Sequence, residues 1–181
     1  MLDFRVILDI RKDALKSMKC DSDDVKISSH WKRFIFISVF HLVPVMICVI
    51  AWTQELKLTT LENYIGSGIA IFTGLFFSLL LSIGAKIRDE KNNPDKDDNN
   101  FMKFKNNMKQ IANITLYVIE IGVLIFIILL LNSLFKTDEY PIVERIFTML
   151  ALFFLARFLT SLFFMIQRFY HVMSDEINNI L

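Results

Sequence analysis

Long apolar runs, separated by polar stretches, organise this chain. The longest covers residues 111–135, and a single carboxylate, Glu120, interrupts it. A helix of about 20 residues, rising about 1.5 Å per residue, crosses the hydrocarbon core of a bilayer. The pattern therefore predicts four transmembrane helices, at residues 34–52, 64–85, 111–135 and 146–166.

The distribution of basic residues predicts how these helices are oriented. Eight Lys or Arg lie in the N-terminal segment 1–33 and seven in the segment 86–110, whereas the other two connections carry few. Cationic side chains concentrate on the cytoplasmic side of a membrane. We therefore expect an all-α integral membrane protein in which four helices form an antiparallel bundle. Both termini, the loop 86–110 and the tail 167–181 are expected in the cytoplasm.

The first residues of the chain fit two patterns. Apolar and charged residues alternate between positions 2 and 10, as in a strand. The same segment also has one apolar helical face, formed by Ile7, Ile10, Ala14 and Met18. We favour an amphipathic helix lying at the cytoplasmic interface, with a strand or a solvated tail as alternatives.

The second apolar run carries small residues at every fourth position. This small-residue stripe comprises Gly66, Ala70, Gly74, Ser78 and Ser82. Small side chains let two transmembrane helices approach closely, and close packing drives their association in lipid. The stripe predicts a helix–helix contact, either within the chain or with another subunit.

Two opposite charges lie inside the third and fourth runs. Glu120 and Arg157 are each about 15 Å from the cytoplasmic end of their helix at the usual helical rise. A charge at that depth is costly and usually has a partner. We therefore predict a Glu120–Arg157 ion pair, with a polar face formed by His41, Asn113 and Tyr117. The pair fits a bridge that fixes helix register, a switch, or the lining of an ion or proton path.

Apolar stripes at helical spacing continue beyond the third and fourth runs on the cytoplasmic side, which predicts helical cytoplasmic extensions of both helices. Because an apolar stripe outside lipid favours contact with another surface, these residues are expected to dock a partner. The proposed docking residues are Phe101, Phe104, Met108, Phe169, Met173 and Ile177. A frayed tail is the alternative for the C-terminal part.

Recognisable catalytic chemistry is absent from the sequence. It contains no nucleotide-binding, phosphate-binding or zinc-protease motif, and its cysteines and histidines are scattered. We therefore expect no enzymatic activity, no metal site and no cofactor.

The organisation of the whole chain resembles the membrane components of bacterial antiphage defence systems, most like that of the two-gene Kiwa system. The features behind this resemblance are the four runs, the Asn- and Asp-rich core of the segment 86–110, and the amphipathic ends. The resemblance implies a homo-oligomer, with a tetramer as the guess, in the lipid of the bacterial inner membrane. It also implies a sensor of phage attack that holds a cytosolic protein partner and does not itself bind nucleic acid.

Two other functional classes share this architecture. Immunity proteins against pore-forming bacteriocins also have four spans and cytosolic termini. A small ion channel lined by Glu120 and Arg157 is the third hypothesis.

Overall fold

The computed structural model describes residues 4–19, 34, 36–58, 62–92, 98–134 and 141–180. Within these ranges the chain forms helices and no strands. The elements are α1 (Phe4–Lys19), the π-helical segment η1 (Ser38–Leu42), α3 (Val43–Thr53), α4 (Glu62–Lys91), α5 (Asp98–Leu134) and α6 (Pro141–Ile180). The all-α class is confirmed for this part of the chain, as is the helix, rather than a strand, in the N-terminal segment.

Three helices are long and apolar enough to cross a membrane. Their candidate spans are Glu62–Asp89 in α4, Phe101–Leu134 in α5 and Ile142–Ser174 in α6. The first predicted run corresponds to a shorter apolar helix, Ser38–Thr53, which combines η1 and α3. These helices identify the chain as a candidate membrane protein.

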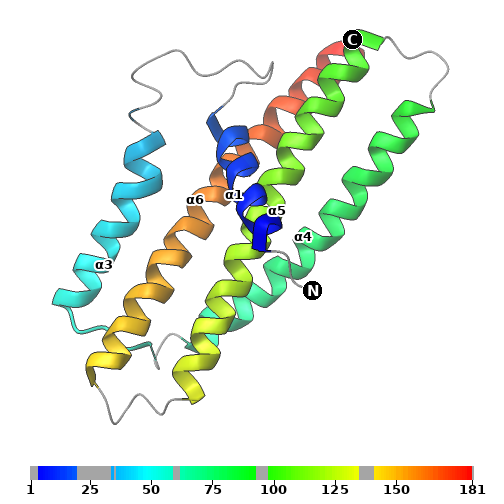
Figure 1. Cartoon of the computed structure of the whole chain (residues 1–181). Coiled ribbons are helices and arrows are strands. Elements are labelled where there is room, and N and C mark those ends of the chain that lie inside the picture. Colours follow the sequence, from blue (N-terminus) through cyan, green and yellow to red (C-terminus); the bar gives the residue numbers. More distant parts are fainter. Residues whose placement is uncertain are drawn as a thin grey trace.

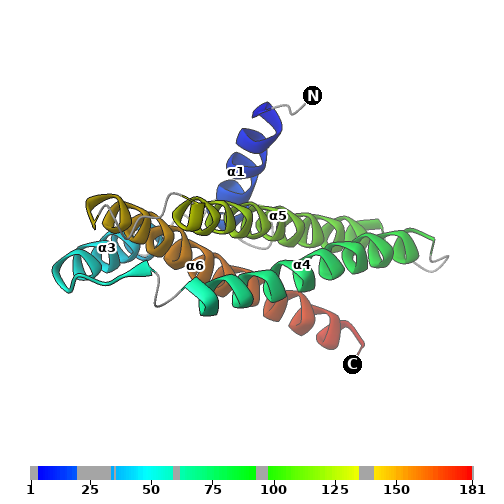
Figure 2. The ribbon, with the colours of Figure 1, turned by 90° about the horizontal axis from the view of Figure 1, so that it is seen from below.

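The long helices lie side by side in the order α3, α6, α5, α4, which we call the helix layer (Figure 1). Figure 2 shows that α1 leaves this layer steeply on one side, with its C-terminal end against α5. The core runs along α5, where Ile111, Ile114, Val118, Ile121 and Ile125 have almost no exposed surface. The central helix thus holds its neighbours in place, and α1 packs on it from outside the layer.

A close contact joins α4 and α5 at Gly122. A Cβ atom at this glycine would lie 3.0 Å from Thr73 Oγ1 and 3.3 Å from Ile69 Cγ2. Ile65, Ile69, Phe76 and Ile83 are the buried apolar residues of α4. Glycine at this position therefore permits the close approach of the two helices.

The first apolar helix changes its winding before a proline. The N–H of Val43 bonds to the carbonyl of Ser38, five residues back, and Pro44 follows directly. Proline has no N–H, and its ring collides with the carbonyl four residues earlier in an α-helix. A wider π-helical turn relieves that collision.

The helices extend beyond the predicted apolar runs. α4 continues to Lys91 and α5 begins at Asp98, so most of the segment 86–110 is helical rather than a loop. Apart from Asp89, residues 85–91 are alanine, lysine, isoleucine, arginine and glutamate, which tolerate a helix well. α6 likewise continues to Ile180, as expected for a fourth helix that projects beyond the apolar run.

Candidate functional site

An ion pair attaches α1 to the middle of α5. Arg11 Nε on α1 donates to Glu120 Oε1 on α5 at 2.5 Å. The Glu120 side chain is only 14% exposed, whereas that of Arg11 is 42% exposed. The second carboxylate oxygen, Glu120 Oε2, is buried without a hydrogen-bond partner. The buried carboxylate therefore depends on Arg11 for its ion pair.

Ser17, which follows Arg11 on α1 by about one and a half helical turns, makes further polar contacts. Asn113 Nδ2 on α5 donates to Ser17 Oγ at 3.3 Å, and Arg168 Nη2 on α6 donates to the Ser17 carbonyl at 3.1 Å. Because Arg11 meets Glu120 and Ser17 meets Asn113, α1 runs antiparallel to α5. The part of α1 from Arg11 to Ser17 therefore contacts the apolar part of α5, while the N-terminal end of α1 leaves the helix layer (Figure 2).

Apolar residues complete the contact of α1 with the layer. Ala14 and Met18 are buried and belong to the same cluster as the core of α5. Both lie on the helical face of α1 that the sequence predicts to be apolar. Arg11 lies on this face too, between Ile7 and Ala14. The helix thus buries an apolar stripe that contains one cation.

The predicted Glu120–Arg157 pair is wrong. Arg157 Nη2 instead donates to Nδ1 of His41, at 3.1 Å. Its guanidinium carbon lies 5.0 Å from the ring centroids of both Phe40 and Phe153. Aromatic faces attract cations, so these rings stabilise Arg157 away from Glu120. The carboxylate goes to Arg11 from a helix that the sequence alone does not place beside α5.

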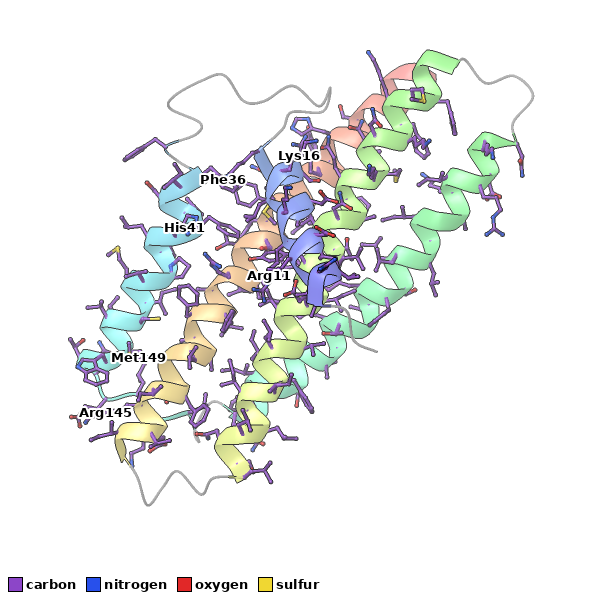
Figure 3. All side chains as sticks on the ribbon, viewed as in Figure 1. Arg11, Lys16, Phe36, His41, Arg145 and Met149 are labelled. Carbon is purple, nitrogen blue, oxygen red and sulfur yellow. The ribbon has the colours of Figure 1, made fainter. Side chains whose placement is uncertain are left out.

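Tyr117 connects the two halves of the site. Its side chain is buried, and it lies close enough to Arg157, Glu120 and Arg11 for each of them to act on it electrostatically. We call the five polar residues the charge cluster: Arg11, His41, Tyr117, Glu120 and Arg157. In Figure 3, Arg11 is on α1 and His41 is in η1, the segment that leads into α3, and α6 passes between α1 and this first apolar helix in that view. The cluster therefore crosses the helix layer rather than running along a helix.

The structure brings all three residues of the predicted polar face to α1 or to the cluster. His41 contacts Arg157, Asn113 contacts Ser17, and Tyr117 lies between the charged residues. Arg11 and Ser17 are the residues that sequence reasoning missed. The signal for Arg11 is its place on the apolar face of α1, where a cation requires a buried partner.

The small-residue stripe is mostly turned away from the rest of the chain. Only its first member faces a neighbour, since a Cβ at Gly66 would lie 3.7 Å from Leu129. A Cβ at Gly74 would meet nothing within 4 Å. Ala70, Gly74, Ser78 and Ser82 are exposed. In-chain packing of α4 thus uses a different face, and the stripe is left open.

The predicted docking residues divide into two groups. Met108 is buried in the core, and Phe104 and Phe169 are partly buried against it. Phe101 is half-buried, whereas Met173 is 52% exposed. The side chain of Ile177 lies outside the described residues. Packing within the chain therefore occupies much of the stripe, and Met173 is its exposed member.

The charge cluster offers two guanidiniums, one carboxylate, one imidazole and one phenol. Among the residues described, no group of three His, Cys, Asp or Glu could hold a metal ion. A separate pocket of about 400 Å³ lies between the start of α4 and the end of α5, and its lining includes Glu62, Gly66 and Leu129. The cluster is built to hold charges in place between helices.

No family model, curated protein or solved structure matches this chain. The charge cluster and the helix layer are therefore the features from which a function is proposed.

Proposed function

We propose that this chain is a non-enzymatic membrane scaffold and sensor subunit. Four spans, formed by the three long helices and the shorter Ser38–Thr53 helix, cross the bacterial inner membrane as an antiparallel bundle. The basic segments 1–33 and 86–110 support cytoplasmic termini. The short first span fits the bilayer when local thinning or tilting of its neighbours compensates.

The Arg11–Glu120 pair is the observation that carries this proposal. It attaches a mostly polar helix from the cytoplasmic end of the chain to a buried carboxylate in the central membrane helix. A movement of α5 against α6 changes the surroundings of Glu120 and so the attachment of α1. The cluster thus couples the state of the helix layer to the cytoplasmic segment.

The arrangement of polar groups favours a scaffold over an ion channel. A conducting path needs polar groups that follow one another through the membrane. Here Tyr117 and Glu120 lie one turn apart on α5. Arg11 on α1 reaches Glu120, and Arg157 on α6 lies near Tyr117, so the charged groups gather within one turn of α5. The carboxylate of Glu120, which a channel would expose, is covered by Arg11.

The cytoplasmic end of α6 is the proposed docking surface for a soluble protein partner. Tyr170 is 71% and Met173 52% exposed there, beyond the apolar run. The open small-residue stripe on α4 supports homo-oligomerisation, because exposed small residues allow a second helix to approach closely. A phage-defence role rests on the resemblance of the sequence, and the docked partner is then the effector.

Co-purification with the proteins of neighbouring genes tests this function. A tagged chain should retain one soluble neighbour, and Met173→Glu should release it, because a charge in an apolar contact is costly. Leu134→Glu is the control, because Leu134 is exposed at the C-terminal end of α5, away from the proposed docking surface. This variant should retain the partner. If no encoded neighbour co-purifies, the scaffold function is contradicted. If deleting the gene leaves phage plating unchanged, the defence role is contradicted.

A further inference from the structure

Basic side chains gather where the C-terminal end of α1 meets the first apolar helix. Lys19 Nζ on α1 lies 5.7 Å from the ring centroid of Phe36, and Lys19 is close enough to His41 to act on it electrostatically. Arg157 Nη2 on α6 lies 3.1 Å from Nδ1 of His41, and Arg157 Nε is buried without a hydrogen-bond partner. Neither Lys19 nor Arg157 forms an ion pair within the part of the chain that the structure describes. The two cations therefore favour an anion from outside the chain.

The contact with Arg157 decides which nitrogen of His41 can donate to such an anion. A guanidinium only donates hydrogen bonds, so Nδ1 of His41 accepts and the ring proton is on Nε2. The His41 side chain is exposed. Nε2–H of His41 is thus a donor that an outside acceptor can reach, with the positive charge of Arg157 at the other nitrogen of the ring.

Both donors lie toward the end of the first apolar helix that we place at the cytoplasmic side. Phe36, beside Lys19, is two residues after Phe34, and His41 is seven residues after it. These positions are about 3 and 10 Å along the helix at the usual rise. In Figure 3, Phe36 and His41 lie toward the same end of this helix, and Lys16 marks the adjacent end of α1. Headgroups occupy roughly 5–8 Å outside each side of the hydrocarbon core, and a bilayer that thins beside a short span brings phosphates closer still.

Exposed apolar side chains continue from His41 toward the middle of the helix. Val45 and Val49 follow it at four-residue spacing and are 52% and 57% exposed. Residues four apart on a helix share a face. A ligand that covers this whole face carries an anionic group next to a hydrocarbon chain, as a phospholipid does and inorganic phosphate does not.

We propose that an anionic phospholipid of the cytoplasmic leaflet binds at this face. Its phosphate accepts hydrogen bonds from Lys19 Nζ and His41 Nε2, and one acyl chain lies along Val45 and Val49. The charges of Lys19 and Arg157 favour a net anionic headgroup, such as phosphatidylglycerol, over phosphatidylcholine, whose headgroup carries a cation of its own. The bound lipid joins α1 to the first apolar helix. This site rests on the membrane location proposed above and is independent of the soluble partner.

Lipid titration of the purified full-length chain in nonionic micelles tests the site. Phosphatidylglycerol should raise the melting temperature, because a ligand that binds the folded state stabilises it. Phosphatidylcholine should need at least an about tenfold higher concentration for the same shift, as expected for one lost charge contact. Inorganic phosphate at the concentration of the lipid should give no shift, which separates a lipid site from a site for free phosphate.

Variants of two lysines on α1 separate this site from general attraction of anionic lipid to a basic chain. Lys19→Gln should weaken the effect of phosphatidylglycerol at least about tenfold, and Lys19→Arg should retain most of it. Lys16→Gln is the matched control, because it removes the same charge from another exposed position of α1 and should behave as wild type. Native mass spectrometry should show retained phosphatidylglycerol on the wild-type chain and on Lys16→Gln, and less on Lys19→Gln.

Three results would overturn the proposal. They are equal stabilisation by phosphatidylglycerol and phosphatidylcholine, a shift with inorganic phosphate as large as that with lipid, and equal losses in Lys19→Gln and Lys16→Gln. Because the purified chain is measured without a soluble partner, failure of the lipid site leaves the test of scaffold function standing. Failure of the partner to co-purify likewise leaves the lipid site intact.

Discussion

Arg11 and Glu120 are 109 residues apart in sequence, yet their side chains form the ion pair that holds α1 on α5. Removing one partner of a buried pair costs about 3–5 kcal/mol, because the other charge is left unpaired. Arg11 is 42% exposed, and solvent screening lowers the expected effect to about 1–3 kcal/mol. Arg11→Gln and Glu120→Gln should each lower the free energy of unfolding by this amount, measured by SDS titration in mixed micelles.

The double variant separates this pair from the one that the sequence suggested. Arg11→Gln with Glu120→Gln should cost less than the sum of the single changes, because each removes the interaction of the other. Glu120→Gln with Arg157→Gln should be closer to additive, since these side chains do not pair. Stronger coupling between Glu120 and Arg157 than between Glu120 and Arg11 would refute this arrangement.

Gly122 and Gly74 should respond in opposite ways to the same substitution. At Gly122 an alanine Cβ would lie 3.0 Å from Thr73 Oγ1, so Gly122→Ala should cost about 1–3 kcal/mol by overpacking. Adding Thr73→Ala removes the crowded oxygen and should recover part of that loss. Gly74→Ala meets nothing within 4 Å and should leave stability unchanged or raise it by up to about 1 kcal/mol. Equal melting temperatures for the two single variants would contradict this packing.

Much of the fold follows from the sequence. The positions of the three long helices are fixed by runs of apolar residues, whose burial in lipid or protein requires internal hydrogen bonds throughout. The helix at Phe4–Lys19 follows from its apolar face. The helix ends are harder to predict from the sequence, because the polar residues near Lys91 and Asp98 fit either a loop or an exposed helix.

The site is harder to predict than the fold. Equal depth along consecutive helices made Arg157 a reasonable partner for Glu120, but depth does not fix the rotation of a helix about its axis. The contacts of Arg157 with Phe40 and His41 turn this face of α6 toward the first apolar helix. Arg11 became the partner because α1 folds back on α5, a long-range contact that periodicity does not encode.

The turn after α3 offers a test of backbone strain. Glu55 has a φ of 51°, in the left-handed region that non-glycine residues rarely adopt, and its carboxylate binds Arg145. Its side chain is 71% exposed, so the ion pair contributes little. Glu55→Ala keeps the strain and loses the pair, whereas Glu55→Gly relieves about 1 kcal/mol of strain. The glycine variant should therefore melt at a higher temperature than the alanine variant, and the reverse order would contradict the assigned turn.

The attachment of α1 to α5, the central helix of the layer, is the central claim, and disulfide trapping in native membranes tests it most directly. With Cys20 and Cys48 replaced by Ser, a chain carrying Ser17→Cys and Asn113→Cys should form an internal disulfide rapidly. The reason is that Ser17 Oγ and Asn113 Nδ2 lie 3.3 Å apart. A chain carrying Lys16→Cys with Asn113→Cys should react much more slowly, since Lys16 is exposed on another face of α1. Equal rates for the two chains, or no internal disulfide in the first, would show that α1 does not pack on α5.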